Sequence, residues 1–335
     1  DKENEKEKQN REGLIDPNEL DNQLRKGVIP DDFKRQMFYT FADYRDLCLG
    51  KDIGKDVRDV ENNINKVLPN NSAKSANGHS RQEWWKKYRE DIWDGMLCGL
   101  SYASGNENNA ETIKSKNNYK EVTFSGGPTG TKLTEFAERS QFLRWFTEWG
   151  EDFCKQQKKE YKELVAKCNN CDVDTDGKSC NAKCGECKTQ CEKYKKWIET
   201  WIDNYKKQKE RYTKVKGTLL YNEDKDVKNS DDARDYLDKQ LQNMKCVNGI
   251  TNKNCDYTCM NESSSTARGD SMPESLDDEP KDVKGKCNCK DEEAPPPQPA
   301  RPDVCNTVAT ALEDNKYIQD ACNQKYGKNA PSNWK

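Results

Sequence analysis

The stretch that decides the fold is Cys168-Asn-Asn-Cys171-Asp-Val-Asp-Thr-Asp-Gly-Lys-Ser-Cys180-Asn-Ala-Lys-Cys184-Gly-Glu-Cys187-Lys-Thr-Gln-Cys191, which holds six cysteines. The whole chain of 335 residues has 16 cysteines, yet 35% of its residues are charged and only 32% are hydrophobic. Cross-links compensate for the small apolar surface, because each one stabilises a fold by roughly 2–4 kcal/mol. Cysteine at this density is typical of an oxidising compartment, so the sequence predicts an extracellular protein.

The same stretch also has a possible interpretation as a zinc site. Cys168 and Cys171, followed by Cys184 and Cys187, have nearly the spacing of a four-cysteine ligand set. Such a site leaves the other twelve cysteines without a role, so we favour disulfides and expect no metal and no cofactor. The sequence does not give the pairing. The cysteines that we expect to be paired are Cys48, Cys98, Cys154, Cys168, Cys171, Cys180, Cys184, Cys187, Cys191, Cys246, Cys255, Cys259, Cys287, Cys289, Cys305 and Cys322.

Apolar residues at helical spacing follow directly after this stretch. Between Tyr194 and Tyr212 the apolar and aromatic positions recur every three to four residues, which predicts a helix that ends near Gly217. Similar patterns predict one helix or a kinked pair over 132–168, and helices over 30–49, 82–99 and 231–244. We expect Ser230 to be the N-cap of the last helix. No long run alternates apolar and polar residues, so the fold class is all-α.

Seven of the eight tryptophans lie at helical spacing within these segments. Large aromatic side chains spaced by three to four residues usually pack on the buried face of a helix. We therefore interpret them as core residues and not as contacts to a partner.

The domain organisation follows from the loops and a proline-rich run. Polar loops are expected over 66–81, 101–132 and 261–279, and the run from Ala294 to Pro302 predicts a stiff linker. We expect one domain over 1–292, the linker over 293–302 and a short helical appendage over 303–335. No apolar run is long enough to span a bilayer, and the charged start lacks a signal-peptide core, so we interpret the chain as an excised piece of an ectodomain.

Few residues are suited to catalysis. The single histidine, His79, lies in a loop rich in Asn, Ser and Gly, where a nucleophile–base pair would be poorly positioned. The loop from Ser125 to Lys132 resembles a phosphate loop, but Thr131 replaces the second glycine of that motif. The sequence therefore predicts a protein that is not an enzyme.

The charge and two short features bear on the binding partner, and each of the two features has alternative interpretations. The net charge of −3 argues against general binding to nucleic acid. Basic residues outnumber acidic ones over 193–216, which indicates either the solvated face of a helix or a patch for heparan sulfate or a sialoglycan. Arg268-Gly269-Asp270 matches an integrin-binding tripeptide, although so short a match also arises by chance.

Several blocks together resemble a known family. They are Phe33-Lys-Arg-Gln-Met-Phe-Tyr-Thr-Phe-Ala-Asp-Tyr-Arg-Asp-Leu-Cys48, Ile92-Trp-Asp-Gly-Met-Leu-Cys98 with Trp84-Trp85 before it, Gln141-Phe-Leu-Arg-Trp-Phe-Thr-Glu-Trp-Gly-Glu-Asp-Phe-Cys154, Tyr194-Lys-Lys-Trp-Ile-Glu-Thr-Trp201, and Pro273-Glu-Ser-Leu with Cys287-Asn-Cys289. This pattern, from about Gly13 to Cys289, resembles the Duffy-binding-like domains of the malarial erythrocyte membrane protein 1 adhesins. Family members open with a cysteine-containing segment, so the amino-terminal part of the domain is expected to be truncated here.

The resemblance implies a helical, disulfide-bonded adhesion domain displayed on the infected erythrocyte as part of a larger membrane-anchored protein, without inserting into the membrane itself. Its variable loops would evade host antibodies. Cys255-Asp-Tyr-Thr-Cys259 is most similar to the beta type, several members of which bind intercellular adhesion molecule 1. The extended ligand signature of one beta subgroup is absent after Val215. Delta, epsilon or zeta types, with ligands such as immunoglobulin M, remain alternatives.

The expected receptor-binding site lies after the basic helix. Leu219, Leu220 and Tyr221 are three apolar residues in an otherwise charged connection, either packed on the core or offered to a partner. The beta-type resemblance implies a receptor surface in this region. We therefore expect these three residues to bind the receptor, together with the start of the next helix at Asp231, Asp232 and Arg234.

Overall fold

The protein is described here by a computed structural model, which is helical almost throughout its described part. The structure describes residues 22–51, 53–54, 57–68, 80–103, 110–124, 130–174, 179–180, 183–244, 257–265 and 272–291, and the single positions 308, 310 and 320. The helices are α3 (Asp31–Cys48), α4 (Arg58–Val67), α5 (Arg81–Ala103), α6 (Ala110–Lys116), α7 (Leu133–Glu138), α8 (Gln141–Cys168), α9 (Gly185–Lys216), α10 (Leu219–Asn222), α11 (Lys225–Lys228) and α12 (Ala233–Gln242). Two 3-10 turns, η4 (Glu274–Leu276) and η5 (Lys281–Val283), and a two-residue pairing of β1 (Ser179–Cys180) with β2 (Lys290–Asp291) complete it. The all-α prediction is confirmed.

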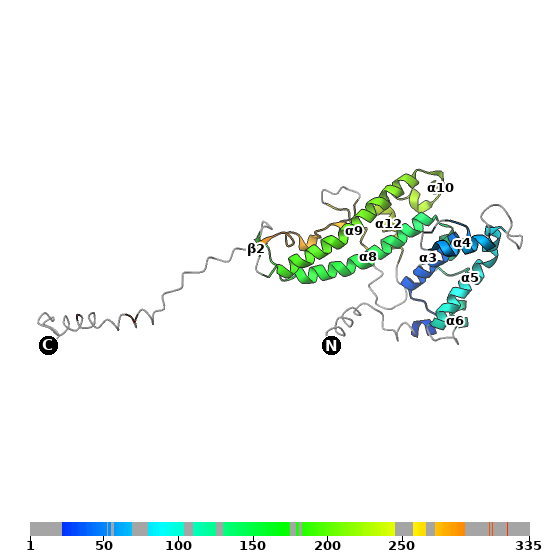
Figure 1. Cartoon of the computed structure of the whole chain (residues 1–335), viewed down its shortest axis with the longest axis horizontal. Helices are drawn as coiled ribbons and strands as arrows, with labels where there is room; N and C mark the ends of the chain where they lie inside the picture. The colour runs from blue at the N-terminus through cyan, green and yellow to red at the C-terminus, as the bar shows by residue number, and fades with distance from the viewer. Residues whose placement is uncertain are drawn as a thin grey trace.

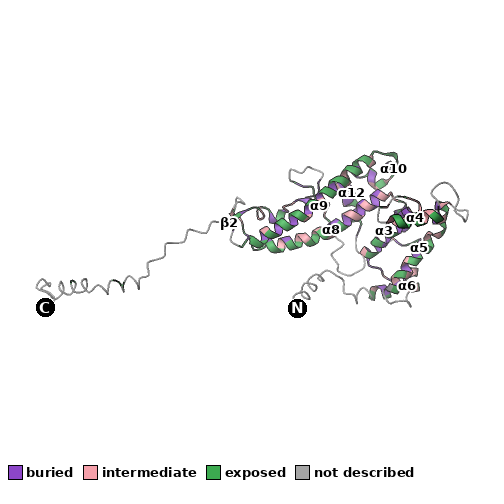
Figure 2. Cartoon of the chain, in the orientation of Figure 1, coloured by how far each residue is buried: buried purple, intermediate pink, exposed green. Residues whose placement is uncertain are grey.

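Two long antiparallel helices, α8 and α9, form the longer lobe, and α12 packs against both (Figure 1). Their contact faces are buried and their outer faces are exposed, as the apolar spacing predicts (Figure 2). The hydroxyl of Ser140 caps α8 by accepting a hydrogen bond from the Leu143 amide at 3.4 Å. α9 ends at Gly217, as predicted.

The shorter lobe is built around α3, which packs against α5 and α7. Phe38 is fully buried, and its ring centroid lies 5.6–5.7 Å from those of Trp93, Phe124 and Phe136. Edge-to-face contacts of this kind add to the free energy gained by burying the rings. A second aromatic cluster, around Phe146 and Tyr236, fills the space between α8, α9 and α12.

Two buried ion pairs join α3 to α8. Arg144 on α8 contacts Asp46 on α3, and both side chains are at most 1% exposed. Arg35 on α3 is paired with Glu151 on α8, with 2.8 Å between Nη2 and Oε1. Burial opposes ionisation of Glu151, but Arg35 and Lys155 outweigh it and lower the pKa of that carboxyl. The two pairs therefore fix how the lobes meet.

The described residues form five disulfides, and four of them lie close together where α8 meets α9. The pairs are Cys154–Cys259, Cys168–Cys187, Cys171–Cys184, Cys180–Cys289 and Cys191–Cys287. Because the four cysteines considered as zinc ligands are bonded in pairs, the zinc interpretation does not hold. Three of the five disulfides bridge more than 90 residues of sequence, which pins the 257–291 segment onto the two long helices.

The prediction that every cysteine is paired is wrong for Cys48 and Cys98, which are free thiols in the structure. Arg81, at the start of α5, donates a hydrogen bond to the carbonyl of Cys48 at 3.2 Å. Cys98 lies further along α5, roughly 25 Å from Arg81 at 1.5 Å rise per residue. A disulfide needs its Cα atoms within about 7 Å, so the two cannot pair with each other. Cys246, Cys255, Cys305 and Cys322 lie outside the described residues.

Several element boundaries differ from the sequence prediction. The N-cap of α12 is Asp232, which accepts a hydrogen bond from the Asp235 amide at 2.9 Å, and not Ser230, whose hydroxyl donates to the Asp226 carbonyl. Helix α6 lies within the expected 101–132 loop. The 132–168 segment is a pair of helices, because Arg139 and Ser140 are extended. The proposed linker and nearly all of the appendage lie outside the described residues. No helix among the described residues is long and apolar enough to cross a membrane.

Replacing Asp46 should test the buried ion pairs. Asp46→Ala leaves the Arg144 guanidinium buried without its carboxylate, so we expect the free energy of unfolding to fall by about 3–5 kcal/mol. Urea unfolding measures this, with the exposed Asp91→Ala as the control, for which we expect a change within about 0.5 kcal/mol. Equal effects of the two substitutions would contradict the assigned role.

The thiol assignment is tested by mapping peptides without reduction. After alkylation and digestion, we expect Cys48 and Cys98 to carry the alkyl group and the five disulfides to be recovered as linked peptides. Recovery of Cys48 or Cys98 in a cross-linked peptide would show that the assignment is wrong.

Candidate functional site

The end of the longer lobe at which α9 stops carries the predicted site, and we call residues 217–232 the distal tip. The chain reverses there through two four-residue helices, α10 and α11. The Thr218 hydroxyl donates to the Val215 carbonyl at 2.8 Å, and the Asp224 carboxylate accepts from the amides of Asp226 and Val227 at 2.9 and 3.2 Å. These short-range hydrogen bonds give a polar connection a defined shape.

The structure separates the predicted receptor residues into exposed and structural ones. Leu219 is 88% exposed, which is unusual for a large apolar side chain on a rigid element. Asp231 is also exposed. Tyr221 is 9% exposed and packs in the core, so the prediction that its ring is offered to a partner is wrong. The side chain of Leu220 lies outside the described residues.

The other two predicted residues hold the tip in place. Asp232 caps α12, as described above, and is partly buried. Arg234 donates hydrogen bonds to the carbonyl oxygens of Met260 and Asn261 at 2.8 and 3.0 Å. These bonds hold residues 260–261 against α12. We therefore assign them a positioning role.

A hollow of about 380 Å³ lies beside the tip, and we call it the tip hollow. It is lined by Lys51, Glu138, Arg139, Ser140, Gln141, Phe142, Leu143, Arg211, Tyr221 and Asp224. Arg139 pairs with Asp226 on α11, and the Arg211 guanidinium lies 4.8 Å from the centre of the Phe142 ring. A hollow lined by an aromatic ring and by charges of both signs suits polar recognition of a protein surface.

Of the residues that line the tip hollow, only Tyr221 was identified from the sequence as a site residue. The others come from the segment after α3, from the end of α7 and the start of α8, from α9 and from the turn before α11, and nothing in their spacing brings them together. The exposed Leu219 was identified because three apolar residues in a charged loop are unusual.

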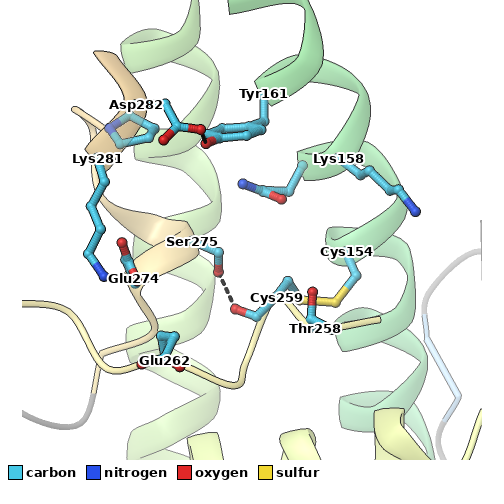
Figure 3. A pocket seen from close by; sticks show the side chains of 12 residues that line it. Cys154, Lys158, Tyr161, Thr258, Cys259, Glu262, Glu274, Ser275, Lys281 and Asp282 are labelled. Carbon is cyan, nitrogen blue, oxygen red and sulfur yellow. Dashed lines mark hydrogen bonds and ion pairs between the residues drawn. A yellow bond between two sulfur atoms is a disulfide. The ribbon is translucent and has the colours of Figure 1, made fainter. Parts of the chain in front are cut away.

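A second cleft, of about 540 Å³, lies between α8 and the 257–291 segment (Figure 3). The Cys154–Cys259 disulfide crosses it, the Tyr161 hydroxyl is hydrogen-bonded to Asp282, and Lys281 pairs with Glu274 at 2.9 Å. Partial burial and the neighbouring Asp282 carboxylate raise the pKa of Tyr161, so its hydroxyl stays protonated near neutral pH. These groups are engaged with one another, which is typical of a structural junction.

The basic helix has a mixed surface. Lys206 lies 4.0 Å from Asp203, and Lys214 lies 2.6 Å from Glu210. Surface pairs of this kind are screened and contribute little. Other cations of α9, among them Lys195 and Lys196, are exposed, so both interpretations of this helix remain. His79 and Arg268-Gly269-Asp270 lie outside the described residues.

The described part of the chain is a helical domain that is cross-linked by disulfides and has an exposed leucine at its distal tip. The family model of the Duffy binding domain matches residues 2–175, which is half of the chain. The model of the C-terminal subdomain of the Duffy-binding-like domain matches residues 148–271. The chain therefore belongs to the Duffy binding domain family.

Similar proteins come from malaria parasites. The Duffy receptor gamma form of Plasmodium knowlesi is 22% identical over 174 residues, which covers 51% of this chain and 14% of that protein. The beta form is also 22% identical and is covered to 13%. The chain thus spans about one seventh of the length of these relatives.

Among solved structures, erythrocyte binding antigen 140 of Plasmodium falciparum is 24% identical, with a TM-score of 0.48 over 77% of this chain and 34% of that one. Its Region II in complex with sialyllactose gives a TM-score of 0.46 over 76% and 33%, respectively.

Two substitutions at the tip should separate surface from core. Leu219→Ser is expected to change the free energy of unfolding by no more than about 0.5 kcal/mol, because the side chain is already in water. Tyr221→Ala should cost about 2 kcal/mol or more, because it leaves a cavity. Thermal melts followed by circular dichroism measure both. A marked loss for Leu219→Ser would place that residue in the core.

Proposed function

We propose that this chain is an adhesion domain that binds a host cell-surface protein through the distal tip. The observation that carries the proposal is Leu219, an exposed apolar residue on a short helix braced by hydrogen bonds and flanked by the tip hollow. Binding energy is usually concentrated in a few apolar or aromatic anchors inside a polar rim. Membership of the Duffy binding domain family supports a receptor-binding role, since two relatives bear the name Duffy receptor.

The finer assignment is intercellular adhesion molecule 1 as the ligand of a beta-type domain. It rests on the resemblance of Cys255-Asp-Tyr-Thr-Cys259 to that type and on the place of the tip after the basic helix. On this proposal the chain is one part of a larger variant adhesin on the infected erythrocyte. Host antibodies would then be its second class of partner. Immunoglobulin M is the alternative ligand for the other domain types.

A different candidate function is binding of a sulfated or sialylated glycan by α9. The exposed lysines of residues 193–216, such as Lys195 and Lys196, favour it. The complex of a similar protein with sialyllactose concerns that protein alone. Charge-driven binding differs from binding by an apolar anchor in its dependence on salt, because exposed charges are screened within roughly 8–10 Å at physiological ionic strength.

One experiment compares these functions. Intercellular adhesion molecule 1, immunoglobulin M and heparin are immobilised, and binding of the chain is measured at about 0.15 and 0.5 M salt. We expect saturable binding to intercellular adhesion molecule 1 that persists at the higher salt concentration and falls at least about tenfold in Leu219→Ser, the loss of one hot-spot contact.

The matched control is Val60→Ser on α4, an exposed apolar residue that belongs neither to the distal tip nor to the lining of the tip hollow. Binding that is lost equally in Val60→Ser, or that leaves Leu219→Ser unaffected, would contradict the tip as the site. Heparin binding that collapses at high salt and depends on Lys195 and Lys196 would instead favour the glycan function.

A further inference from the structure

A third cavity, of about 590 Å³, lies where α3 approaches α8. It is lined by Gln36, Trp145, Glu148, Trp149, Asp152 and Lys155, and we call it the indole–carboxylate cavity. Five of the six residues belong to α8 at spacings of three to four, so they share one face of that helix. This face joins two indole rings to two carboxylates in one open cavity.

The indole rings are held in fixed positions. The Trp149 ring lies 5.6 Å from Phe153 and 5.9 Å from Tyr205, and is stacked on both. The Trp145 indole donates from Nε1 to Asp43 at 3.0 Å. The sequence predicted these tryptophans as core, yet both are only partly buried. Rings that are pre-oriented and still accessible bind a ligand without the entropy cost of ordering those rings.

The charges around the cavity are predominantly negative. Lys155 is a cation of the lining, but it pairs with Glu151 at 3.0 Å. Asp152 accepts hydrogen bonds from Gln156. Glu148 has neither a hydrogen bond nor an ion pair with any described residue. A carboxylate beside two indole rings is therefore left without a cationic partner.

Ionising Glu148 in these surroundings costs free energy, and the pKa of Glu148 is therefore raised to about 7. Partial burial is the largest cause of this raised pKa. The neighbouring carboxylates of Asp43, Glu151 and Asp152 raise the pKa further, and the positive charge of Arg144 lowers it. Since the folded pKa lies above that of an ordinary glutamate, ionisation of Glu148 destabilises the fold as the pH rises from about 4.5 towards 7. A bound cation would remove this cost.

We propose that the indole–carboxylate cavity is a docking site for a basic side chain, lysine or arginine, of a protein partner. Charge complementarity selects the occupant, because a guanidinium or ammonium pairs with Glu148 and Asp152. The electron-rich faces of indole rings attract cations within about 6 Å of the ring centre. The site is on the α3–α8 face and does not depend on the proposed function of the tip.

Other occupants fit less well. An anion would be repelled by the carboxylates. A divalent cation prefers several free oxygen ligands, and here Asp152 is already hydrogen-bonded while indole rings offer no oxygen. A long side chain with an apolar stem and a charged end uses both the rings and the carboxylates.

The test uses the whole chain and two blocked peptides, acetyl-Gly-Arg-Gly-amide and its uncharged counterpart with Gln in place of Arg. Indole N–H signals are followed by NMR at pH 8 and assigned with Trp145→Phe and Trp149→Phe. We expect the arginine peptide to shift the Trp145 and Trp149 signals saturably, with a Kd in the millimolar range, and the glutamine peptide to shift neither.

Glu148→Gln should weaken binding of the arginine peptide at least about tenfold, the equivalent of one pKa unit of lost interaction. Glu199→Gln, an exposed carboxyl on α9, is the matched control and should leave the affinity unchanged. In the unsubstituted chain the affinity should be higher at pH 8 than at pH 6, because Glu148 is ionised at the higher pH. This difference should be small in Glu148→Gln.

Folding is checked by the melting temperature. Glu148→Gln removes a buried charge, so its melting temperature should equal or exceed that of the unsubstituted chain at pH 8. If the variant melts earlier, Asp152→Asn serves as the second variant, with the same expected loss of affinity. The proposal is overturned if neither indole signal shifts or if the glutamine peptide binds equally well. It is also overturned if tetramethylammonium binds as tightly as the arginine peptide, because that result would indicate a site for small free cations.

Discussion

The rest of the structure depends on the buried ion pairs between α3 and α8. Arg144 with Asp46 and Arg35 with Glu151 lie almost without solvent between the two lobes. A buried pair of charges is favourable only when its geometry is well satisfied, since desolvation costs several kcal/mol per ion. That requirement fixes the rotation and register of α3 along α8 more strictly than apolar packing alone. The tip hollow and the indole–carboxylate cavity are both lined by residues of α8, so the positions of both proposed binding surfaces depend on this register.

The disulfides act at the opposite end of the longer lobe. Four of them tie α8, α9 and the 257–291 segment together where those helices meet, far along the helices from the distal tip. With this end cross-linked, the tip needs only local hydrogen bonds, such as those of Asp224 and Asp232, to hold its shape. A domain built in this way can change exposed tip residues such as Leu219 without losing its fold.

Helix α8 carries two glutamates three residues apart, Glu151, which is paired with cations, and Glu148, which is not paired with any described residue. Glu151 faces Arg35 and Lys155, and its pKa is lowered despite burial. Glu148 faces the indole–carboxylate cavity, and its pKa is raised by burial and by the surrounding carboxylates. The two pKa values differ because the side chains of Glu148 and Glu151 point in different directions from α8. Residues three apart on a helix are separated by about 60° around its axis.

The sequence by itself determined the helical class and the approximate extents of α3 and α5, because helical spacing is a local property. It located α8 and α9 but not where they begin, since α8 starts at Gln141 after a break and α9 starts at Gly185, before the predicted pattern. It predicted disulfides but not which cysteines form them. It also identified Leu219 as an anomaly. Only the tertiary structure decided that Tyr221 is buried, that Arg234 holds the segment after α12, and that Cys48 and Cys98 are too far apart to pair. The tip hollow and the state of Glu148 were likewise decided there. These features depend on contacts between residues distant in sequence, which the ion pairs and disulfides bring together and which no local pattern encodes.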